Sequence, residues 1–301
     1  MCRSARVLLV LLVTLVAAPA HALAAGPVVA VIDSGVDLTH PALRGHLWTN
    51  PGEVAGNGID DDGDGVVDDV HGADMVDGDG RPDDRDGHGT HVAGIIALDG
   101  RRATGARLMA VGVLGADGRG TGADLARGID YAVARGARIL NLSLAYYGPD
   151  PDLRAALERA VAAGATIVTA SGNDAADLDA APTYPAAFHL PGMIVVASAT
   201  GGGGLAASSS YGSEVVDLAA PGMHVRSTLP RGRWGRMSGT SQATAVVSRA
   251  AVALLKANPS LTGAQVRSAL VSSVRAAPAT RGDTISGGVL NAAAALRTLL
   301  G

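Results

Sequence analysis

The stretch VVAVIDSGVD, residues 28–37, begins with five apolar residues and then reaches an aspartate. Such a run predicts a strand buried on both faces, because parallel strands pack against helices on each side. Four later runs have the same character, at residues 108–114, 138–144, 166–170 and 193–197. Alanine-rich stretches with helical spacing occupy residues 123–135, 152–163, 241–257 and 262–274. This alternation predicts one α/β domain with a doubly wound, mostly parallel sheet flanked by helices.

The first 24 residues have the composition of a secretory signal peptide. A basic head, MCRSAR, precedes the apolar run VLLVLLVTLVAA, and small residues follow in AHALA. About 20 apolar residues are needed to cross a bilayer, so a cleaved signal is favoured over an uncleaved anchor. We therefore expect a signal peptide over residues 1–24, a mature domain over residues 25–301, and secretion to the periplasm or outside the cell. We expect no membrane association after cleavage.

Composition argues against nucleic-acid binding. The formal net charge is −4, there is one lysine against 23 arginines without a basic run, and only eight residues are aromatic. The one cysteine, Cys2, lies in the signal segment, so the mature protein is expected to contain no disulfide. We expect it to be a monomer.

An acidic insert occupies about residues 50–86, and twelve aspartates against two arginines fall within residues 60–86. So many like charges repel each other unless the loop is fully solvated or a cation lies among them. The segment DDDGDGVVD places carboxylates at positions 1, 3, 5 and 9 of a calcium-loop pattern, with Gly65 at position 6. The twelfth position is His71 rather than glutamate, so a structural calcium site and a solvated acidic loop both remain open. The expected ligands are Asp60, Asp62, Asp64, Val66 and Asp68.

Three polar residues are predicted at the carboxyl ends of strands or the amino ends of helices, where open α/β sheets bind their ligands. Asp33 ends the first strand, His88 begins the apolar helical run HGTHVAGIIA, and Ser241 begins a later helix. A serine nucleophile needs a base within hydrogen-bond reach, and the base needs an orienting carboxylate. The three residues therefore match the needs of nucleophilic acyl transfer. His91 lacks the four-residue spacing of a zinc pair and is interpreted as structural.

The chain resembles the subtilisin family of serine peptidases (subtilases) from about residue 28 to about residue 295. The resemblance rests on five segments in family order: VIDSGVDLTHPAL, DGHGTHVAG, ILNLSLAYYG, IVTASGNDA and SGTSQATA. The chain order Asp, His, Ser is also that of subtilisin. The resemblance implies that His88 is the general base, that Asp33 orients it, and that Ser241 is the nucleophile. It implies that Asn173 donates to the oxyanion and that the chemistry requires no cofactor.

The resemblance also implies that substrate binds as an extended strand between two segments of the enzyme. Residues 118–120 would form one edge, residues 143–145 the other, and residues 170–172 the wall of the primary specificity pocket. Ala145 and Thr183 stand where the family usually has glycine, and their added volume predicts a preference for small or medium apolar residues over large aromatic ones. The expected substrate-binding residues are Gly118, Gly120, Ser143, Leu144, Ala145, Ala170, Ser171, Gly172 and Thr183.

The leading interpretation is a secreted serine endopeptidase that hydrolyses protein or peptide substrates through an acyl-enzyme. The main alternative is a catalytically silent subtilase fold that acts as a calcium-stabilised peptide-binding module. A third is a non-peptidase hydrolase, such as an esterase, built on the same residues. The presence of Asp33, His88, Ser241 and Asn173 together argues against the silent module, because a binding role requires none of them.

Overall fold

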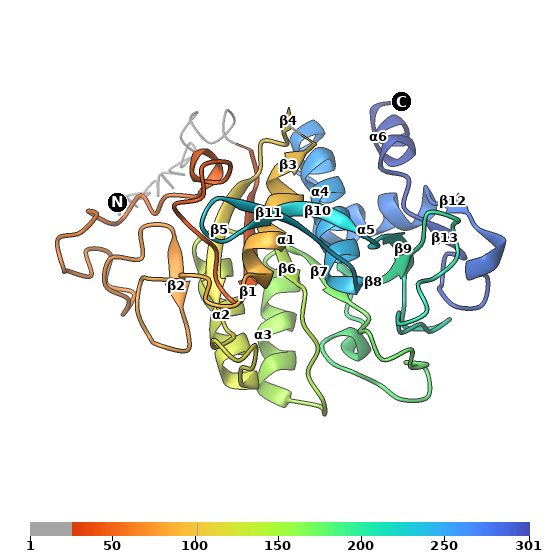
Figure 1. Ribbon diagram of the computed structural model, residues 1–301, viewed down its shortest axis with the longest axis horizontal. Coiled ribbons are helices and arrows are strands. Elements are labelled where there is room, and N and C mark those ends of the chain that lie inside the picture. The colour runs from red at the N-terminus through yellow and green to blue at the C-terminus, as the bar shows by residue number, and fades with distance from the viewer. Residues whose placement is uncertain (1–25, 101) are drawn as a thin grey trace, which may run out of the picture.

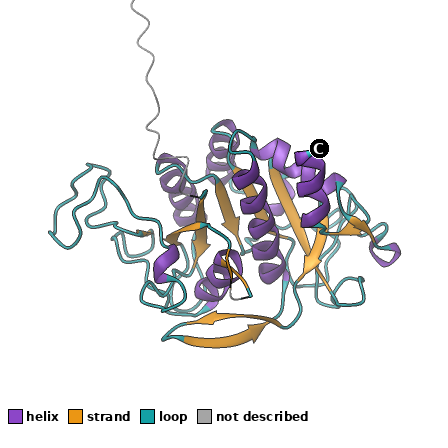
Figure 2. Ribbon diagram, turned by 90° about the horizontal axis from the view of Figure 1, so that it is seen from above, coloured by secondary structure: helices purple, strands orange, loops and turns teal. Residues whose placement is uncertain are grey.

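The computed structural model describes residues 26–100 and 102–301, so the expected signal peptide lies outside the described residues. A nine-stranded sheet runs through the domain, and helices cover both of its faces (Figures 1 and 2). The strand order is β12-β13-β9-β8-β7-β6-β1-β5-β2, and every described neighbour pair is parallel except β12 with β13. The predicted doubly wound, mostly parallel α/β fold in a single domain is confirmed.

The strands of the sheet are β1 Val28–Asp33, β2 Gly72–Asp74, β5 Arg107–Gly112, β6 Ile139–Leu142, β7 Thr166–Ala170, β8 Met193–Ala199, β9 Leu218–Pro221, β12 Arg275–Ala276 and β13 Gly288–Val289. Two hairpins lie outside it, β3 Leu98–Asp99 with β4 Arg102–Ala103 and β10 Val225–Leu229 with β11 Arg233–Met237. The helices are α1 His88–Ala97, α2 Gly122–Ala134, α3 Pro151–Ala162, α4 Thr240–Ala257, α5 Gly263–Ser272 and α6 Ala292–Leu300. Among the described helices, none combines the length and the hydropathy needed to span a bilayer.

Alternate side chains of the central strands supply two hydrophobic cores. In β1, Val29 and Val31 pack on the face covered by α1, α4, α5 and α6. Ala30 and Ile32 pack on the opposite face, which α2 and α3 cover. Successive side chains of a strand point to opposite faces, so a strand covered on both sides has to be apolar at every position. This explains the continuous apolar runs in the sequence.

The same alternation decides where the polar groups at the strand ends point. Asp33 follows Val31 on the face of β1 that α1 covers, at the carboxyl end of the strand. Ser143, just beyond β6, has the register of Ile139, which packs on that same face against α4. Both side chains therefore point to the face of the sheet that α1 and α4 cover.

Candidate active site

The segment around His88 owes its local conformation to the two glycines that flank this residue. Gly87, at the N-cap of α1, has a φ of 105°, a left-handed conformation that favours glycine. Because Gly87 has no side chain to cap the helix, Asp84 takes that role, and its Oδ2 accepts the Thr90 N–H in the first turn at 2.8 Å. A Cβ at Gly89 would lie 2.0 Å from the Gly35 carbonyl oxygen. The glycines therefore allow α1 to begin directly against the end of β1.

His88 and Asp33 are in direct contact. His88 Nδ1 lies 2.8 Å from Asp33 Oδ1, and Asp33 is fully buried. The charge of Asp33 is the main reason that the pKa of His88 rises to about 9; burial of the ring opposes the rise, and the nearby Asp86 and Asp84 add to it. Because an ionised carboxylate only accepts hydrogen bonds, the pairing makes Nδ1 the donor. In the neutral ring Nε2 is then left to accept a proton.

Ser241 is the second residue of α4 and lies against the end of β6. Its hydroxyl donates to the Ser143 carbonyl at 3.1 Å, and the Ser143 hydroxyl donates to the Ser241 carbonyl at 3.1 Å. The buried network continues inward, since Asn141 Nδ2 donates to Ser143 Oγ at 2.9 Å and Ser248 Oγ donates to Asn141 Oδ1 at 2.8 Å. These bonds hold the first turn of α4 at the carboxyl end of the sheet.

The structure therefore pairs Asp33 with His88 but gives the Ser241 hydroxyl a different partner. Within the described part of the chain, Ser241 Oγ bonds the Ser143 carbonyl and not the imidazole. Rotation about the Cα–Cβ bond of Ser241 would release the hydroxyl from the Ser143 carbonyl. Hydrogen bonds of this kind are often long or misaligned in a free enzyme and tighten when substrate binds.

Asn173 lies beside the turn that precedes Ser241. Its Oδ1 accepts the backbone N–H of Thr240 at 3.0 Å and the Thr240 hydroxyl at 3.2 Å. Gly239 leaves room for this approach, because a Cβ there would lie 3.1 Å from the same oxygen. With its oxygen engaged, the exposed Asn173 side chain keeps its amide donors available. The amide and the amino end of α4 together offer donors for an anion.

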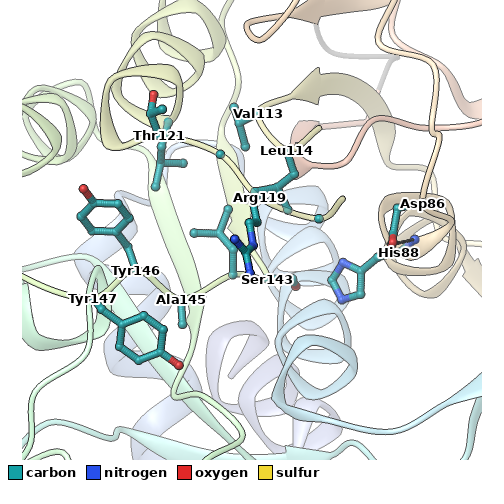
Figure 3. Close-up of a pocket in the computed structure, with 14 residues that line it drawn as sticks. Asp86, His88, Val113, Leu114, Arg119, Thr121, Ser143, Ala145, Tyr146 and Tyr147 are labelled. Carbon is teal, nitrogen blue, oxygen red and sulfur yellow. Dashed lines mark hydrogen bonds between the residues drawn. The ribbon is translucent and has the colours of Figure 1, made fainter. Parts of the chain in front are cut away.

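A cleft of about 710 Å³ opens beside His88 (Figure 3). Two of its walls are the segments predicted to bind substrate. Gly118 and Gly120 belong to the first wall, which we define as residues 118–121. The second wall is residues 143–147, which include the predicted Ser143, Leu144 and Ala145.

The remaining predicted substrate residues lie together but do not line this cleft. Ala170 ends β7, and Ser171 and Gly172 follow it. Thr183 is buried against this segment, with its hydroxyl 3.5 Å from the Ser171 carbonyl. A Cβ at Gly172 would lie 4.0 Å from Thr183 Oγ1. Thr183 therefore contacts residues 171–172. These residues were expected to form the wall of the specificity pocket, which Thr183 was expected to narrow.

The part of the acidic insert that precedes β2 forms a long loop at the β2 end of the sheet (Figure 1). Asp60 accepts the N–H groups of residues 63 and 65 at 2.7 and 2.8 Å. Asp62 and Asp64 both form ion pairs with Arg135, which follows α2. Asp68 accepts the N–H groups of residues 56–58. The five predicted ligands therefore do not all converge on one centre.

A different set of carboxylates comes together in this loop. Oxygens of Glu53, Asp60 and Asp62 lie within 4.8 Å of one another, whereas Asp64, Val66 and Asp68 are not in that group. Glu53 Oε2 is buried and, among the described residues, has no hydrogen-bond partner. Three convergent carboxylates, one with an unpartnered oxygen, fit a hard cation such as calcium. Glu53 lies outside the repeating pattern of the loop, so the pattern could not identify it.

Comparison with known proteins agrees with this geometry. The Subtilase family profile matches residues 24–289. Thermitase from Thermoactinomyces vulgaris is 36% identical over 269 residues, covering 87% of this chain and 83% of that protein. Subtilisin BL from Lederbergia lenta is 34% identical over 278 residues, covering 90% of this chain and 91% of that protein.

A solved structure shows the same relationship in three dimensions. The crystal structure of a cold adapted subtilisin-like serine proteinase matches with a TM-score of 0.75 and 28% identity, and the match covers 89% of each chain. The sequence and structural matches span most of the chain. This chain therefore belongs to the subtilase family of serine endopeptidases.

Proposed function

We propose that this subtilase hydrolyses peptide bonds through an acyl-enzyme formed on Ser241. The observation that carries the proposal is the 2.8 Å contact between Asp33 Oδ1 and His88 Nδ1, at one end of the cleft. Ser241 Oγ attacks the scissile carbonyl carbon while His88 Nε2 takes the hydroxyl proton. His88 then gives that proton to the leaving amine, and water releases the acyl group by the same route.

Asn173 Nδ2 and the backbone N–H of Ser241 are assigned to the oxyanion of the tetrahedral intermediate. One such donor stabilises the transition state by about 2.7–4 kcal/mol, a magnitude measured in a subtilisin. The substrate is a protein or peptide, bound as an added strand between the first and second walls. Catalysis in this family requires no cofactor.

Labelling by a sulfonyl fluoride or an organophosphonate, run alongside casein cleavage, tests this proposal. We expect one label per chain, attached to Ser241, and loss of casein cleavage in proportion to labelling. If the protein is neither labelled nor able to cleave casein, the silent peptide-binding module is favoured. Labelling and ester hydrolysis without casein cleavage would favour an esterase.

We also propose that the protein acts as a secreted monomer, outside the cell or in the periplasm, after removal of residues 1–24. The basic head, short apolar run and small residues of that segment support export. Amino-terminal sequencing of the exported protein is expected to place cleavage after Ala22 or Ala24.

The primary pocket is expected to favour small or medium apolar residues. Thr183 is buried on the backbone of residues 171–172, and the methyl group of Ala145 adds volume on the second wall. In a peptide library we expect a higher kcat/KM after alanine or valine than after phenylalanine or tyrosine. Thr183→Gly should reduce that difference about tenfold, since a change of this size in a pocket is worth about 1–3 kcal/mol. Equal or better cleavage after aromatic residues in the unmodified protein would contradict the expectation.

We propose that Glu53, Asp60 and Asp62 hold a structural calcium ion. Arg135 neutralises the charges of Asp62 and Asp64 through ion pairs. Glu53 Oε2 has no hydrogen-bond partner among the described residues. If calcium is first present at about 100 times its Kd, removing it should lower the melting temperature by about 5–10 °C. The measurement is a melting curve with calcium and with excess EDTA.

Two variants make the calcium test specific. Glu53→Gln should abolish the calcium dependence of the melting temperature. Asp77→Asn removes the same charge from an insert residue that pairs with Arg85 at 2.7 Å, outside the three-carboxylate group, and should preserve that dependence. An unchanged melting temperature in EDTA would leave the insert as a solvated acidic loop.

A further inference from the structure

Arg119 places an unpaired positive charge inside the substrate cleft. It lies in the middle of the first wall, and its side chain projects into the cleft towards Ser143 and Ala145 of the second wall (Figure 3). Among residues 26–100 and 102–301, no carboxylate forms an ion pair with it. Arg127, on the neighbouring α2, pairs with Asp124 at 2.6 Å. The contrast shows that Arg119 is not neutralised by the fold in the way that its neighbour is.

The backbone of Arg119 is fixed even though its guanidinium is not paired. Its N–H donates to Asp117 Oδ1 at 3.1 Å, and its carbonyl accepts the Gly115 N–H at 2.8 Å. This turn sets the point from which the side chain enters the cleft. The five N–H donors of the guanidinium remain available for a ligand in a planar arrangement that matches a carboxylate.

The surroundings of Arg119 favour a negatively charged ligand. Of the described residues that line the cleft, Arg119 alone carries a permanent positive charge. The one acidic residue in the lining, Asp86, accepts the backbone N–H of His88 at 3.0 Å and so lies at the His88 end. Apolar side chains such as Val113, Leu114 and Leu144 make up much of the remainder. Arg119 itself is exposed, so an ion pair formed there is partly screened by water and depends on ionic strength.

We propose that Arg119 is a specificity-determining residue that favours substrates with an aspartate or glutamate in the segment lying between the two walls. The proposal rests on the peptidase function proposed above. A substrate strand presents successive side chains to opposite faces, so only a residue of the correct register faces the guanidinium. The preference is therefore expected at one substrate position, where a carboxylate forms a charge-assisted, bidentate contact with Arg119.

Matched peptides that differ only by glutamate or glutamine at one position provide the test. Scanning each position around the scissile bond in the unmodified protein should find one at which glutamate raises kcat/KM about 3- to 10-fold at low ionic strength. That ratio should fall towards one in about 1 M salt, where charges are screened within about 3 Å. Arg119→Gln should bring the ratio to one. Arg119→Glu should reverse the preference, so that lysine is favoured over glutamine.

A control variant separates a local contact from a change in overall charge. Arg297→Glu makes the same charge change on an exposed residue of α6, which lies at the opposite end of the sheet from β2, and should leave the glutamate preference unchanged (Figure 1). Equal cleavage of glutamate and glutamine peptides at every position would overturn the role of Arg119 and leave the peptidase function standing. Loss of cleavage of both peptides alike in Arg119→Gln would make the residue a structural part of the wall and would also overturn it. No cleavage of any peptide by the unmodified protein would overturn the peptidase function itself.

Discussion

Replacing Ser241 with alanine is expected to lower kcat about 10⁶-fold, the magnitude found in a subtilisin that lacks its serine or its histidine. The substitution removes the oxygen that bonds the substrate carbonyl carbon, so no acyl-enzyme can form. The fold should survive, because the Ser143 hydroxyl still donates to the Ser241 backbone carbonyl after the change. Single-turnover kinetics on a chromogenic peptide, with a melting curve for each variant, measure both effects.

Ser248→Ala is a matched control for this experiment. It removes a buried hydroxyl from the same helix, and the lost bond is to Asn141 Oδ1 at 2.8 Å. We expect a cost of about 1–2 kcal/mol in the free energy of unfolding and a far smaller effect on kcat. His88→Ala combined with Ser241→Ala should be little worse than either alone, because the residues act as a unit. A Ser241→Ala protein within tenfold of the normal kcat would contradict the acyl-enzyme.

The elements that could be predicted from sequence are those whose pattern follows from burial. The five predicted strands and four predicted helices all form, with bounds that differ by at most two residues. The hairpin of β10 and β11 could not be found in this way, because RWGRM in β11 is largely exposed and mixes charged with apolar residues. Contacts between residues distant in sequence hold the hairpin over α1 (Figure 1). One of them is the hydrogen bond from the Thr228 hydroxyl to the Thr90 carbonyl at 2.7 Å.

The candidate site shows the same division between local pattern and long-range contact. The alternation in β1 places Asp33 on the face that α1 covers, and the glycines beside His88 allow α1 to approach closely enough for the two side chains to meet. The orientation of the Ser241 hydroxyl cannot be read from a periodic pattern. It depends on a hydrogen bond to the Ser143 carbonyl, which lies just beyond β6 and far away in the chain. The sequence did not predict the hydrogen bonds that link Ser143, Asn141 and Ser248 for the same reason.

The acidic insert shows how a purely local pattern can mislead. The calcium-loop spacing assumes that one continuous segment surrounds the ion. In the structure Arg135, 73 residues beyond Asp62, forms ion pairs with Asp62 and Asp64. Glu53, which precedes the calcium-loop pattern of residues 60–71, joins Asp60 and Asp62 instead. A spacing rule cannot show either contact, because both depend on how the loop packs on itself and on the end of α2.

Replacing Asp33 with asparagine is expected to lower kcat about 10⁴-fold and to change the pH dependence of activity. An ionised Asp33 only accepts from His88 Nδ1, whereas an amide can donate to it and stabilise the tautomer in which Nε2 already carries a proton. That tautomer cannot act as the base towards Ser241. Losses of about 10⁴-fold follow removal of this carboxylate in serine proteases of two unrelated folds.

The pH profile gives a separate measurement of the same contact. The general base has to be neutral, so kcat/KM should rise with pH as His88 loses its proton, with the rise centred near the pKa of about 9 that Asp33 produces. In Asp33→Asn the main cause of the raised pKa is gone and burial of the ring, which lowers the pKa, remains. The rise should therefore move to lower pH. An unmodified protein whose activity already rises near pH 6.5 would contradict the raised pKa of His88.

Stability should change in the opposite direction over the same pH range. Folding raises the pKa of His88, so the Asp33–His88 pair stabilises the folded state. This contribution is complete below about pH 6.5 and is lost as the pH rises through about 9. The loss amounts to at most about 3 kcal/mol in the free energy of unfolding. Asp69, whose pKa is raised to about 6 by burial, titrates below this window. The melting temperature of the unmodified protein should therefore fall between pH 6.5 and 9 while kcat/KM rises, and in Asp33→Asn that fall should be largely absent. If both proteins showed the same fall, the stability change would have to come from groups other than this pair.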